Sequence, residues 1–598
     1  MKLSRLYSNK PNLFEPINFT QELNVILAEI RLPENLDKDT HNLGKTTLGR
    51  LIDFMFLLKR DKNFFLFKHI ELFKSFTFFL ELQTLDASFL TIKRSVSNNT
   101  KISFKRHPGR HGDFVSSPAA EWDHFQVPID RARKILDGLL DLQALKPWNY
   151  RKGIGFQLRS QDDFRDVFKL TRFAGSHSDW KPFVAHILGF DANLIELHYR
   201  KEDELKSKVS EEDILKKELG DSDQDISRIE GLLLLKQDEV DKKQEVLDAF
   251  DFRAPDIERT EQLVDNIDEQ ISSLNARRYS LRHNRKKILE ALNENQILFR
   301  PNEAQRLFEE AGIIFQGQIV RDFEQLIAFN QSITDERYQY LQEEYSDIES
   351  ELNNINQTLE ALGRQRSEML SFLSETDIFE KYKKVSDEIV ILKADITSLN
   401  RKRGSLSRLQ ELRNTIRGLQ EERTQLHANI EFDVDHKTTD KTSLFSLIRL
   451  SFNEIVEEVI DRKALLRVAV NNSGHLDFKA EILDESGNTT SADLGHTYRK
   501  LLCVAFDLAI LRAHIDQNFS RFVYHDGVFE SLDDRKKENL LTILERYTNM
   551  GIQSVITSID SDLPIRNTGQ GRVFDDSQIV LTLHDQGDEG RLFKMRAW

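Results

Sequence analysis

The residues with the clearest chemical character lie in the stretch 41–48, which reads HNLGKTTL. Glycine, lysine and threonine in this order are typical of a loop that binds phosphate at the start of a helix. Backbone N–H groups near Gly44 can surround a phosphate, and the helix N-terminus favours its negative charge. Lys45 can reach the β and γ phosphates of a nucleotide, and the Thr46 hydroxyl can bind Mg²⁺. The residues expected to contact the nucleotide are Asn42, Gly44, Lys45, Thr46 and Thr47.

This loop is only half of the usual phosphate-loop motif. The full pattern has a glycine six residues before the lysine, where this sequence has Asp39. The flanking segments favour phosphate binding, because an apolar run at 24–30 (NVILAEI) can be the strand that leads into the loop and a helical pattern follows at 48–58. The alternative is a glycine turn before an ordinary core helix.

A candidate metal ligand lies near the other end of the chain, in residues 521–534 (RFVYHDGVFESLDD). The apolar residues 522–524 predict a buried strand, and Asp526 follows at its end. A carboxylate there can hold Mg²⁺ through water, opposite Thr46. The alternative is an acidic turn after a strand. Together, the loop and the acid predict one site for ATP and Mg²⁺ that is built from both ends of the chain.

Length, charge and cysteine content limit the class of protein. A chain of 598 residues is too long for one core, and its net charge of −15 leaves only local patches for nucleic acid. A single cysteine, Cys503, excludes a disulfide framework and a cysteine-rich zinc site, and it fits a reducing cytoplasm. We expect a cytoplasmic protein without membrane association, because no run of ~18 apolar residues and no signal-peptide pattern occurs.

The elements that must hold the two candidate segments can be predicted from the flanking sequence. Strands are expected at 2–7, 24–30, 153–161, 522–524, 554–557, 579–583 and 591–595, and hairpins at 64–104 and 465–482. Helices are expected at 129–145, 163–168, 180–188, 192–199, 443–460 and 500–513. This alternation predicts an α/β head assembled from the N- and C-terminal parts.

Between these parts, from about residue 201, glycine and proline become scarce and charge becomes dense and mixed. Apolar residues then follow a 4-3 spacing, broken at Arg366 and repeated in a new phase: Leu341, Tyr345, Ile348, Leu352, Ile355, Leu359, Leu362 and Met369, then Tyr382, Val385, Ile389, Leu392, Ile396, Leu399 and Leu406. Such heptads predict a coiled coil. An earlier and weaker set is Ile271, Leu274, Leu281, Ile288 and Leu292, interrupted by Arg278 and Arg285.

The coiled-coil segments predict a hairpin within one chain. Residues 298–336 carry Pro301, Gly312 and Gly317 and are expected to form an apex at which the chain turns back. The predicted organisation is a first half-head at 1–200, a first arm at 201–297, the apex, a second arm at 337–432 and a second half-head at 433–598. Arms of ~70–100 residues would span roughly 100–150 Å. The alternative is parallel pairing between two chains.

This arrangement of split head, coiled arms and apex resembles the SMC and RecN-like class of ABC ATPases, and HNLGKTTL with HDGVFESLDDR resembles its bacterial YydD-like branch. The resemblance implies that Lys45 and Thr46 bind ATP and Mg²⁺ and that Asp526 is the Walker B acid. It assigns the D-loop to residues 532–533, in which Asp533 would contact the nucleotide. It assigns the Q-loop glutamine, which contacts Mg²⁺, to Gln161, with Gln157 as a rival.

Several positions depart from the pattern of that class. Gly527 stands where a water-polarising glutamate normally follows the Walker B acid, and Glu530 is the nearest acid that can replace it. The signature loop is represented by 491–500 (SADLGHTYRK), where Gly495, with Ser491 or His496, would meet the partner's γ-phosphate and Asp493 must turn away. Ser558 stands at the position where that class carries its switch histidine. We therefore expect slow or partner-activated turnover, with Glu530 and Asp526 as the catalytic residues.

Basic clusters on the arms raise the question of DNA binding. One cluster comprises Arg277, Arg278, Arg282, Arg285, Lys286 and Lys287, and folding about residue 320 would bring it near Arg364 and Arg366. Residues 401–417 form a second basic band. These bands can neutralise DNA phosphates. The alternative is the solvated face of a coiled coil with mixed charges.

The sequence as a whole predicts an ABC-type ATPase head that carries a long antiparallel coiled-coil hairpin. ATP would be held between two heads of a homodimer, and head engagement would act through the arms on DNA and on a partner protein, in anti-phage defence or genome maintenance. A nucleotide-gated scaffold that controls a separate effector, such as a nuclease, is the main alternative. A structural coiled-coil protein with a vestigial head is a third.

Overall fold

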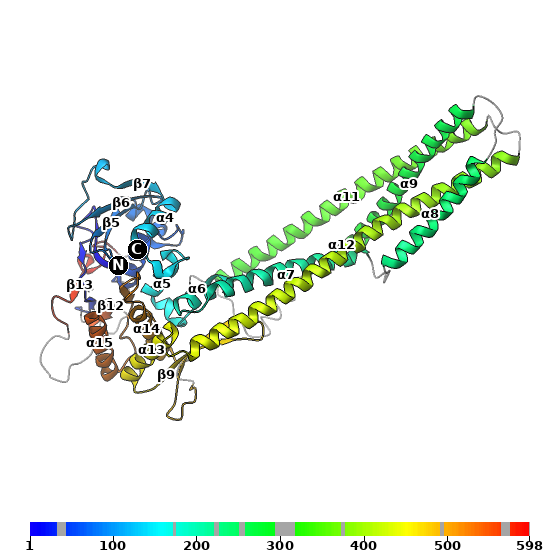
Figure 1. Cartoon of the computed structure of the whole chain (residues 1–598). Helices are drawn as coiled ribbons and strands as arrows, with labels where there is room; N and C mark the ends of the chain where they lie inside the picture. Colours follow the sequence, from blue (N-terminus) through cyan, green and yellow to red (C-terminus); the bar gives the residue numbers. More distant parts are fainter. Residues whose placement is uncertain are drawn as a thin grey trace. The chain divides into compact units, whose positions relative to one another are not determined.

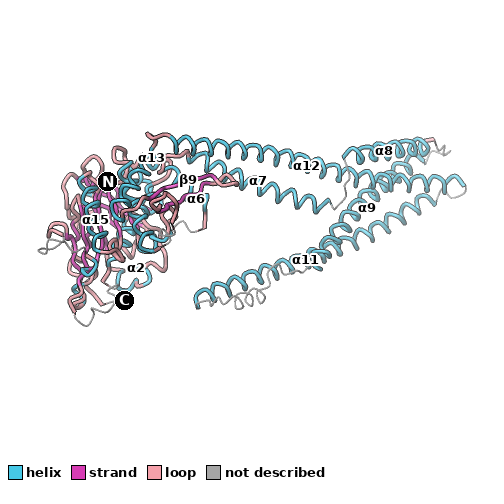
Figure 2. Tube along the Cα trace, turned by 90° about the horizontal axis from the view of Figure 1, so that it is seen from below, coloured by secondary structure: helices cyan, strands magenta, loops and turns pink. Residues whose placement is uncertain are grey.

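The computed structural model describes residues 1–32, 43–171, 175–219, 226–249, 257–293, 317–371, 377–490, 495–563, 574–596 and 598. The chain forms two compact units, one from residues 1–205 with 419–598 and one from residues 206–418. All described strands belong to the first unit, whereas the described part of the second is helical (Figure 2). Among the described helices, none combines the length and the apolar character that crossing a membrane requires.

A five-stranded parallel sheet forms the centre of the first unit. Its strand order is β13-β3-β12-β11-β8. The strands are β3 (Leu23–Glu29), β8 (Leu158–Arg159), β11 (Phe522–His525), β12 (Gln553–Ile559) and β13 (Ile579–His584). Blue and red segments of Figure 1 therefore share one sheet, because its strands come from both ends of the chain. The two halves of the first unit cannot form this core separately.

Burial on both faces explains why these strands are almost continuously apolar. The first six residues of β3 are buried, as are the four residues of β11, which is typical of a central strand in a parallel sheet. Helices pack against this sheet: α1 (Lys45–Met55), α5 (Tyr150–Gln157), α14 (His496–Ala513) and α15 (Asp534–Asn549). The carboxyl ends of β3, β11 and β12 open at one edge, where α/β folds bind ligands.

A second sheet is antiparallel, with the order β2-β1-β4-β5-β6-β7. Its strands are β1 (Lys2–Ser8), β2 (Ile17–Asn18), β4 (Thr77–Gln83), β5 (Phe89–Ser95), β6 (Lys101–His107) and β7 (His124–Pro128). The predicted hairpin at 64–104 is thus a three-stranded meander, and it is preceded by two short helices, α2 (Phe65–Lys68) and α3 (Ile70–Phe73). Phenylalanines of this region pack around Phe593, which ties the C-terminal segment to the second sheet.

Three predicted elements of the first unit are wrong. Residues 153–161 do not form a strand, because Asn149 caps α5 through its side chain and the helix continues to Gln157, leaving two residues for β8. The predicted helix at 163–168 is a 3₁₀ turn, η4 (Gln161–Arg165), that is closed by a capping box at Ser160. Residues 591–595 form no strand and instead follow the turn η8 (Asp588–Gly590).

The remaining elements of the first unit follow the predicted types. They are α4 (Ile129–Leu140) with the turn η3 (Gln143–Leu145), α6 (His177–Ile187), α13 (Leu444–Ile460) and the hairpin of β9 (Ala464–Val470) with β10 (Leu476–Ile482). Helix α7 (Ala192–Leu219) starts in the first unit and continues into the second. The β9–β10 register runs from Leu476 opposite Val470 to Ile482 opposite Ala464.

The second unit contains the end of α7, which lies along α12, and two antiparallel helix pairs. The helices are α8 (Ile226–Asp248), α9 (Ile257–Asn293), α11 (Gly317–Ser371) and the first part of α12 (Asp377–Thr439). One seam joins Leu281 and Ile288 of α9 to predicted heptad residues of α11, among them Leu352. The other joins α8 to the second-phase heptad of α12, through Val240 and Ile389. The change of heptad phase therefore marks a change of helix partner.

Helix α9 also runs alongside α12, in the same direction. Ser386 of α12 donates a hydrogen bond to Asp268 of α9 over 2.7 Å, and further along both helices His283 lies near Lys402. Since α8 is antiparallel to α12 and α9 is parallel to it, the α9–α11 pair doubles back along the α8–α12 pair. The predicted apex lies partly outside the described residues, and α11 already begins at Gly317 within it.

The predicted neighbour of the first basic cluster is confirmed in part, because Arg278 lines a cavity together with Arg366. Arg277 pairs with Glu351 over 2.8 Å, so the helices fold about a point nearer residue 314 than 320, and most of the cluster lies opposite α11 residues N-terminal to Arg364. Arg366 is buried and binds Asp268 over 2.7 Å, as well as Asp387 and Ser386. This ion-pair network explains the break in the heptad and removes Arg366 from any basic surface.

Candidate nucleotide-binding site

The predicted phosphate loop ends at the N-terminus of α1. Gly44 is the N-cap of this helix and has φ 109°, a left-handed conformation that favours glycine. A β-carbon at this position would lie 2.6 Å from the β-carbon of Leu592, whose backbone N–H donates a hydrogen bond to Leu43. The loop is therefore held in place by the C-terminal segment. Asn42 lies outside the described residues, and Thr47 lies in the first turn of α1.

Two residues far apart in sequence meet at the start of α1. The Thr46 hydroxyl donates a hydrogen bond of 2.6 Å to Oδ2 of Asp526, which directly follows β11 and is 1% exposed. The other carboxylate oxygen of Asp526 accepts a hydrogen bond of 2.7 Å from the Thr557 hydroxyl of β12. The predicted pair of magnesium-binding side chains is thus assembled, and its carboxylate is fixed from two strands.

The Lys45 amine has an unusual environment. It is buried, and it finds no hydrogen-bond partner among the described residues. Burial lowers the pKa of Lys45, whereas the nearby Glu530 and Asp526 raise it. Its backbone carbonyl accepts a hydrogen bond of 2.9 Å from Tyr524 of β11, and Gly49 leaves room for that ring. A buried ammonium without a partner normally costs stability unless a ligand supplies the acceptors.

Glu530 lies at the same edge of the sheet. Its carboxylate accepts hydrogen bonds from Gln161 at 3.2 and 3.4 Å and pairs with Lys500 of α14 at 3.0 Å. Lys500 also donates a hydrogen bond of 2.8 Å to the carbonyl of Gly527. A β-carbon on Gly527 would collide with the Glu530 carboxylate. Glu530 therefore occupies the space beside the position where the ATPases that the sequence resembles carry their glutamate.

The two candidate Q-loop glutamines differ clearly in position. Gln161 begins η4 and reaches the Glu530 carboxylate. Gln157 lies in α5, 2% exposed, and borders a small apolar cavity with Phe183 and Ile187. Of the two, only Gln161 contacts a residue of the candidate site among the described atoms.

A buried charge network lies behind Asp526. Arg159 of β8 forms two hydrogen bonds of 2.7 Å with the Asp507 carboxylate of α14, and both side chains are fully buried. Despite burial, Asp507 keeps the pKa of Arg159 above its ordinary value. His525, the residue before Asp526, lies 3.1 Å from the same carboxylate. The network joins β8, β11 and α14 and fixes the strand that ends at Asp526.

Three other predicted residues have local roles in the described chain. Gly495 is the N-cap of α14, and residues 491–494 of the signature-like loop lie outside the described residues. Asp533 is the N-cap of α15, accepts a hydrogen bond of 3.0 Å from the backbone of Lys536, and has a lowered pKa because of Lys536. Ser558 donates to the carbonyl of Ile559 over 3.0 Å. These residues do not contact Lys45, Thr46 or Asp526 in any described interaction.

The residues present fit a nucleotide with magnesium. The buried Lys45 amine lacks an acceptor, the αL glycine leaves backbone N–H groups free to face a phosphate, and the Thr46 hydroxyl and Asp526 carboxylate offer the hard oxygen ligands that Mg²⁺ prefers. Sequence reasoning assigned no role to Lys500, the last residue of the segment 491–500, or to Thr557, the last residue of the strand predicted at 554–557. A lone lysine at the start of the apolar helix α14 is the one available signal for Lys500.

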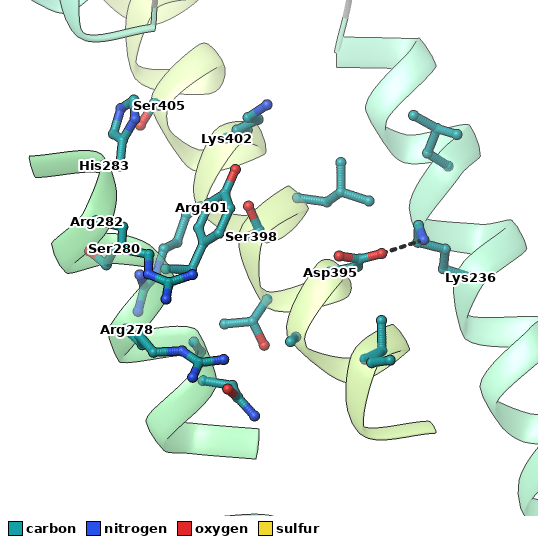
Figure 3. A pocket seen from close by; sticks show the side chains of 18 of the residues that line it. Lys236, Arg278, Ser280, Arg282, His283, Asp395, Ser398, Arg401, Lys402 and Ser405 are labelled. Carbon is teal, nitrogen blue, oxygen red and sulfur yellow. Dashed lines mark hydrogen bonds and ion pairs between the residues drawn. The ribbon is translucent and has the colours of Figure 1, made fainter. Parts of the chain in front are cut away.

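The predicted basic residues gather elsewhere, around a cavity of about 770 Å³ in the helical unit (Figure 3). Helices α8, α9 and α12 line it, together with Leu219 at the end of α7. Its cations are Lys236, Arg278, Arg282, Lys287, Arg401 and Lys402, with His283 beside them, and Asp395 pairs with Lys236 over 2.7 Å. The two predicted basic bands thus meet each other, because α9 runs parallel to α12.

Comparisons with known proteins give limited matches. Residues 455–597 match the model of a family described as "Uncharacterised protein conserved in bacteria (DUF2326)". A comparison with curated proteins found no match. Solved structures include the Smc head domain with a coiled coil and joint from Pyrococcus yayanosii, at 11% identity and a TM-score of 0.33 over 93% of this chain and 92% of that one.

A second solved structure is the Smc head domain of Pyrococcus furiosus with an extended coiled coil, bound to the C-terminal domain of ScpA. It shares 10% identity, with a TM-score of 0.31 over 94% of this chain and 90% of that one. At such scores the likeness does not extend to activity, substrates or partners. The observed fold is a mixed α/β unit with long helices, and its chemistry follows from its own residues.

Proposed function

We propose that this chain is an SMC-like ATPase that binds ATP and Mg²⁺ at the edge of the five-stranded sheet. The observation that carries the proposal is the meeting of Lys45 and Thr46, at the N-terminus of α1, with Asp526 at the end of β11. An orphaned buried amine beside an assembled hydroxyl–carboxylate pair is suited to a magnesium-bound triphosphate. The predicted YydD-like branch remains part of this proposal.

Each residue would contribute a distinct interaction. The backbone N–H groups at the start of α1 bind phosphate oxygens, and Lys45 neutralises charge on the β and γ phosphates. Thr46 and Asp526 hold the metal, with Gln161 close by. When bound, Mg²⁺ supplies positive charge that offsets the phosphates. Thr557 orients Asp526 through its hydrogen bond of 2.7 Å.

Glu530 is the proposed base that orients the attacking water. Its carboxylate takes the space beside Gly527, and hydrogen bonds from Gln161 and Lys500 fix its direction. A carboxylate that reaches the site from three residues further along the chain is a substitute for the usual glutamate. Because its geometry differs from that glutamate, we expect slow hydrolysis.

Dimerisation and DNA contact complete the proposal. Gly495 and Asp533 lie at helix N-caps, where a second head could meet them, so we propose an ATP-dependent homodimer. The cationic cavity of the helical unit would contact DNA phosphates, and a partner protein would supply or receive the output. A role in anti-phage defence or genome maintenance, in the cytoplasm, is the biological setting that the family resemblance suggests.

The test is ATP turnover by the purified chain, with and without linear DNA. Lys45→Ala should weaken ATP binding about 10- to 100-fold, because a charge-assisted hydrogen bond contributes about 1.5–3 kcal/mol. Glu530→Gln should retain binding and lose turnover. Lys74→Ala, at an exposed lysine, is the control. ATP binding that is unchanged in Lys45→Ala would overturn the site.

A second function is favoured by Gly527 and Ser558, which replace two hydrolytic residues of the related ATPases. In this alternative the chain is a nucleotide-gated scaffold that dimerises on ATP and controls a separate effector. It predicts Lys45-dependent ATP binding and dimerisation with no turnover in the presence of DNA. Sedimentation with ATP, compared with turnover under the same conditions, distinguishes the two functions.

A further inference from the structure

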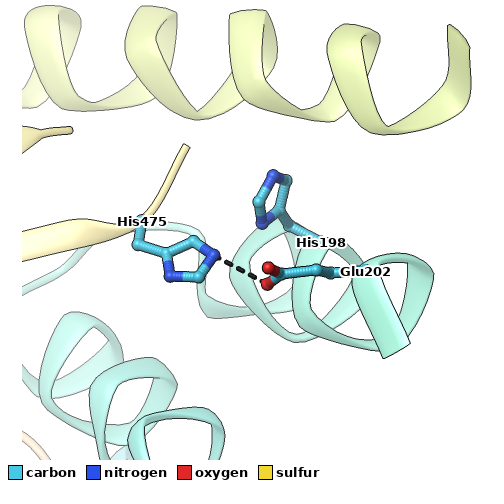
Figure 4. Close-up of side chains that lie close together, drawn as sticks. All are labelled: His198, Glu202 and His475. Carbon is cyan, nitrogen blue, oxygen red and sulfur yellow. Dashed lines mark ion pairs between the residues drawn. The ribbon is translucent and has the colours of Figure 1, made fainter. Parts of the chain in front are cut away.

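Two histidines and a glutamate converge in the first unit, away from the residues assigned to nucleotide binding (Figure 4). His198 and Glu202 lie on α7, and His475 directly precedes β10. One ligand atom of each residue lies within 4.8 Å of those of the other two. Two imidazoles and one carboxylate at such distances form a donor set that is common in zinc sites.

The local structure aims these side chains at one point. His198 and Glu202 are four residues apart on a helix, so they project from the same face. His475 is positioned by the turn between β9 and β10, in which Asn471 accepts hydrogen bonds from the backbone N–H groups of Ser473 at 3.0 Å and His475 at 3.1 Å. The helix and the hairpin therefore fix the three donors independently.

The hairpin turn approaches His198 very closely at Gly474. This glycine has φ +82°, and a β-carbon on it would lie 2.6 Å from Nε2 of His198. A residue with a side chain would be strained at that φ and would also fill the space beside the imidazole nitrogen. The absence of a side chain at Gly474 therefore leaves the space beside this nitrogen unfilled.

One of the two imidazoles has a nitrogen without a partner among the described residues, and the other faces only the Glu202 carboxylate. His198 is 1% exposed, and its Nε2 makes no hydrogen bond among the described residues. Nε2 of His475 lies 2.8 Å from Oε2 of Glu202, but it too makes no hydrogen bond there. Orphaned buried polar atoms are destabilising, and native proteins contain few of them. A bound cation would satisfy both nitrogens.

Burial affects both imidazoles in the same direction. Burial, followed by the neighbouring His475, lowers the pKa of His198 to about 4. Burial lowers the pKa of His475 as well, although Glu202 opposes this shift. Both imidazoles are therefore neutral at pH 7, which is the form that binds metal. A plain ion pair with Glu202 would require a protonated His475.

We propose that His198, Glu202 and His475 form a zinc-binding site. Water or His427, whose ring centroid lies 6.5 Å from that of His198, would take the fourth position of a tetrahedral set. Since His198 precedes the helical unit in the chain and His475 follows it, the ion would cross-link the two halves of the first unit. The site does not depend on the proposed ATPase activity.

The test is zinc content and affinity of the untagged full-length protein. After dialysis, elemental analysis should find about one equivalent of zinc per chain, and protein stripped with a chelator should take it up again with a rise in melting temperature. Cobalt substituted at the same site should give the visible absorption of a tetrahedral centre. Either Glu202→Gln or His475→Gln should weaken zinc binding at least about 100-fold.

His436→Ala, which removes an exposed histidine of α12, is the matched control and should leave zinc binding unchanged. Circular dichroism of each variant shows whether it is folded. If Glu202→Gln unfolds, the comparison rests on His475→Gln. The proposal is overturned if stripped wild-type protein takes up no zinc, if folded site variants bind zinc as wild type does, or if the control loses zinc equally.

Discussion

The Glu530 carboxylate fills the space beside the α-carbon of Gly527. Gly527 has φ +67°, a left-handed conformation, and its carbonyl accepts a hydrogen bond from Lys500. The site therefore has room for one acidic group at this place, and that group comes from position 530. A glycine after Asp526 is a steric requirement of this arrangement.

Gly527→Ala should reduce both stability and turnover. Left-handed backbone in a residue with a side chain costs about 1–2 kcal/mol, and the added carbon would also displace Glu530. Gly487→Ala is the control, because Gly487 has φ +81° with open space around it and reports backbone strain alone. Denaturant unfolding and ATP turnover measure the two effects. Equal losses of stability in the two variants would argue against a collision with Glu530.

Lys500→Met should lower ATP turnover more than it lowers ATP affinity. The lysine holds the Glu530 carboxylate at 3.0 Å and the Gly527 carbonyl at 2.8 Å, whereas no described contact joins it to Lys45 or Thr46. Comparing kcat with the Kd for ATP separates these effects. Lys243→Met, at a surface ion pair of the helical unit, should change neither quantity. Loss of ATP binding in Lys500→Met would instead assign this lysine to the nucleotide.

Asp507→Asn should be strongly destabilising, by about 3–5 kcal/mol, because it leaves the Arg159 guanidinium buried without its counter-charge. Glu71→Gln removes a partner of the exposed Lys74 and should cost less than about 1 kcal/mol. Urea unfolding of both variants provides the comparison. Arg159 also donates to the carbonyls of Asp163, Asp166 and Val167. Similar costs in the two variants would mean that these carbonyls alone satisfy Arg159.

Cys503 should resist thiol reagents in the folded protein. Burial raises the pKa of its thiol from an ordinary 9.0 to about 12, so the thiolate fraction at pH 8 is about 1,000-fold lower than in the unfolded chain. Labelling with a chromogenic disulfide, with and without guanidinium, measures this difference. The unfolded thiol ionises first as the pH rises, so stability should fall from pH 9 toward 12. Rapid labelling of native protein at pH 8 would contradict the prediction.

Arg366→Ala should destabilise the helical unit without changing DNA affinity. Arg366 is buried and holds Asp268, Ser386 and Asp387, whereas Arg364, two residues earlier on α11, is exposed. Arg364→Ala is therefore the control and should leave the melting curve unchanged. Far-UV circular dichroism and DNA titration of both variants test this assignment. Weaker DNA binding in folded Arg366→Ala would return this residue to the basic surface.

Segments whose functional residues are neighbours along the chain could be predicted from the sequence. Gly44, Lys45 and Thr46 are consecutive, and their loop, preceding strand and following helix are readable from the apolar pattern alone. Asp526 was predictable because it ends a short apolar run. Helix pairing followed from heptads such as Leu352 and Ile389, since each a/d set needs a partner surface.

Other features could not be predicted because they depend on contacts between segments that are far apart in the sequence. Lys500 and Thr557 reach the candidate site only through the packing of α14 and β12, and no spacing rule connects them to Asp526. Arg159 and Asp507 are single charges in two apolar segments, and that pattern could have indicated a buried pair. The strand predicted at 153–161 is wrong. The segment contains two glycines, which are unfavourable in a helix, and its residues are buried without a helical period, so its sequence does not indicate α5.

Because α9 and α11 double back along α8 and α12, they affect the thickness of the helical unit and not its length. Lys287, near the end of α9, borders the same cavity as Ser405 of α12, so the α9–α11 pair lies beside the α8–α12 pair over this stretch. Helices α9 and α11 therefore add thickness here, whereas the length of the unit is set by α12 and by α7 and α8, which pair along it. Residues added to α9 and α11 would enlarge a lateral surface, and residues inserted in α12 together with α7 or α8 would lengthen the unit.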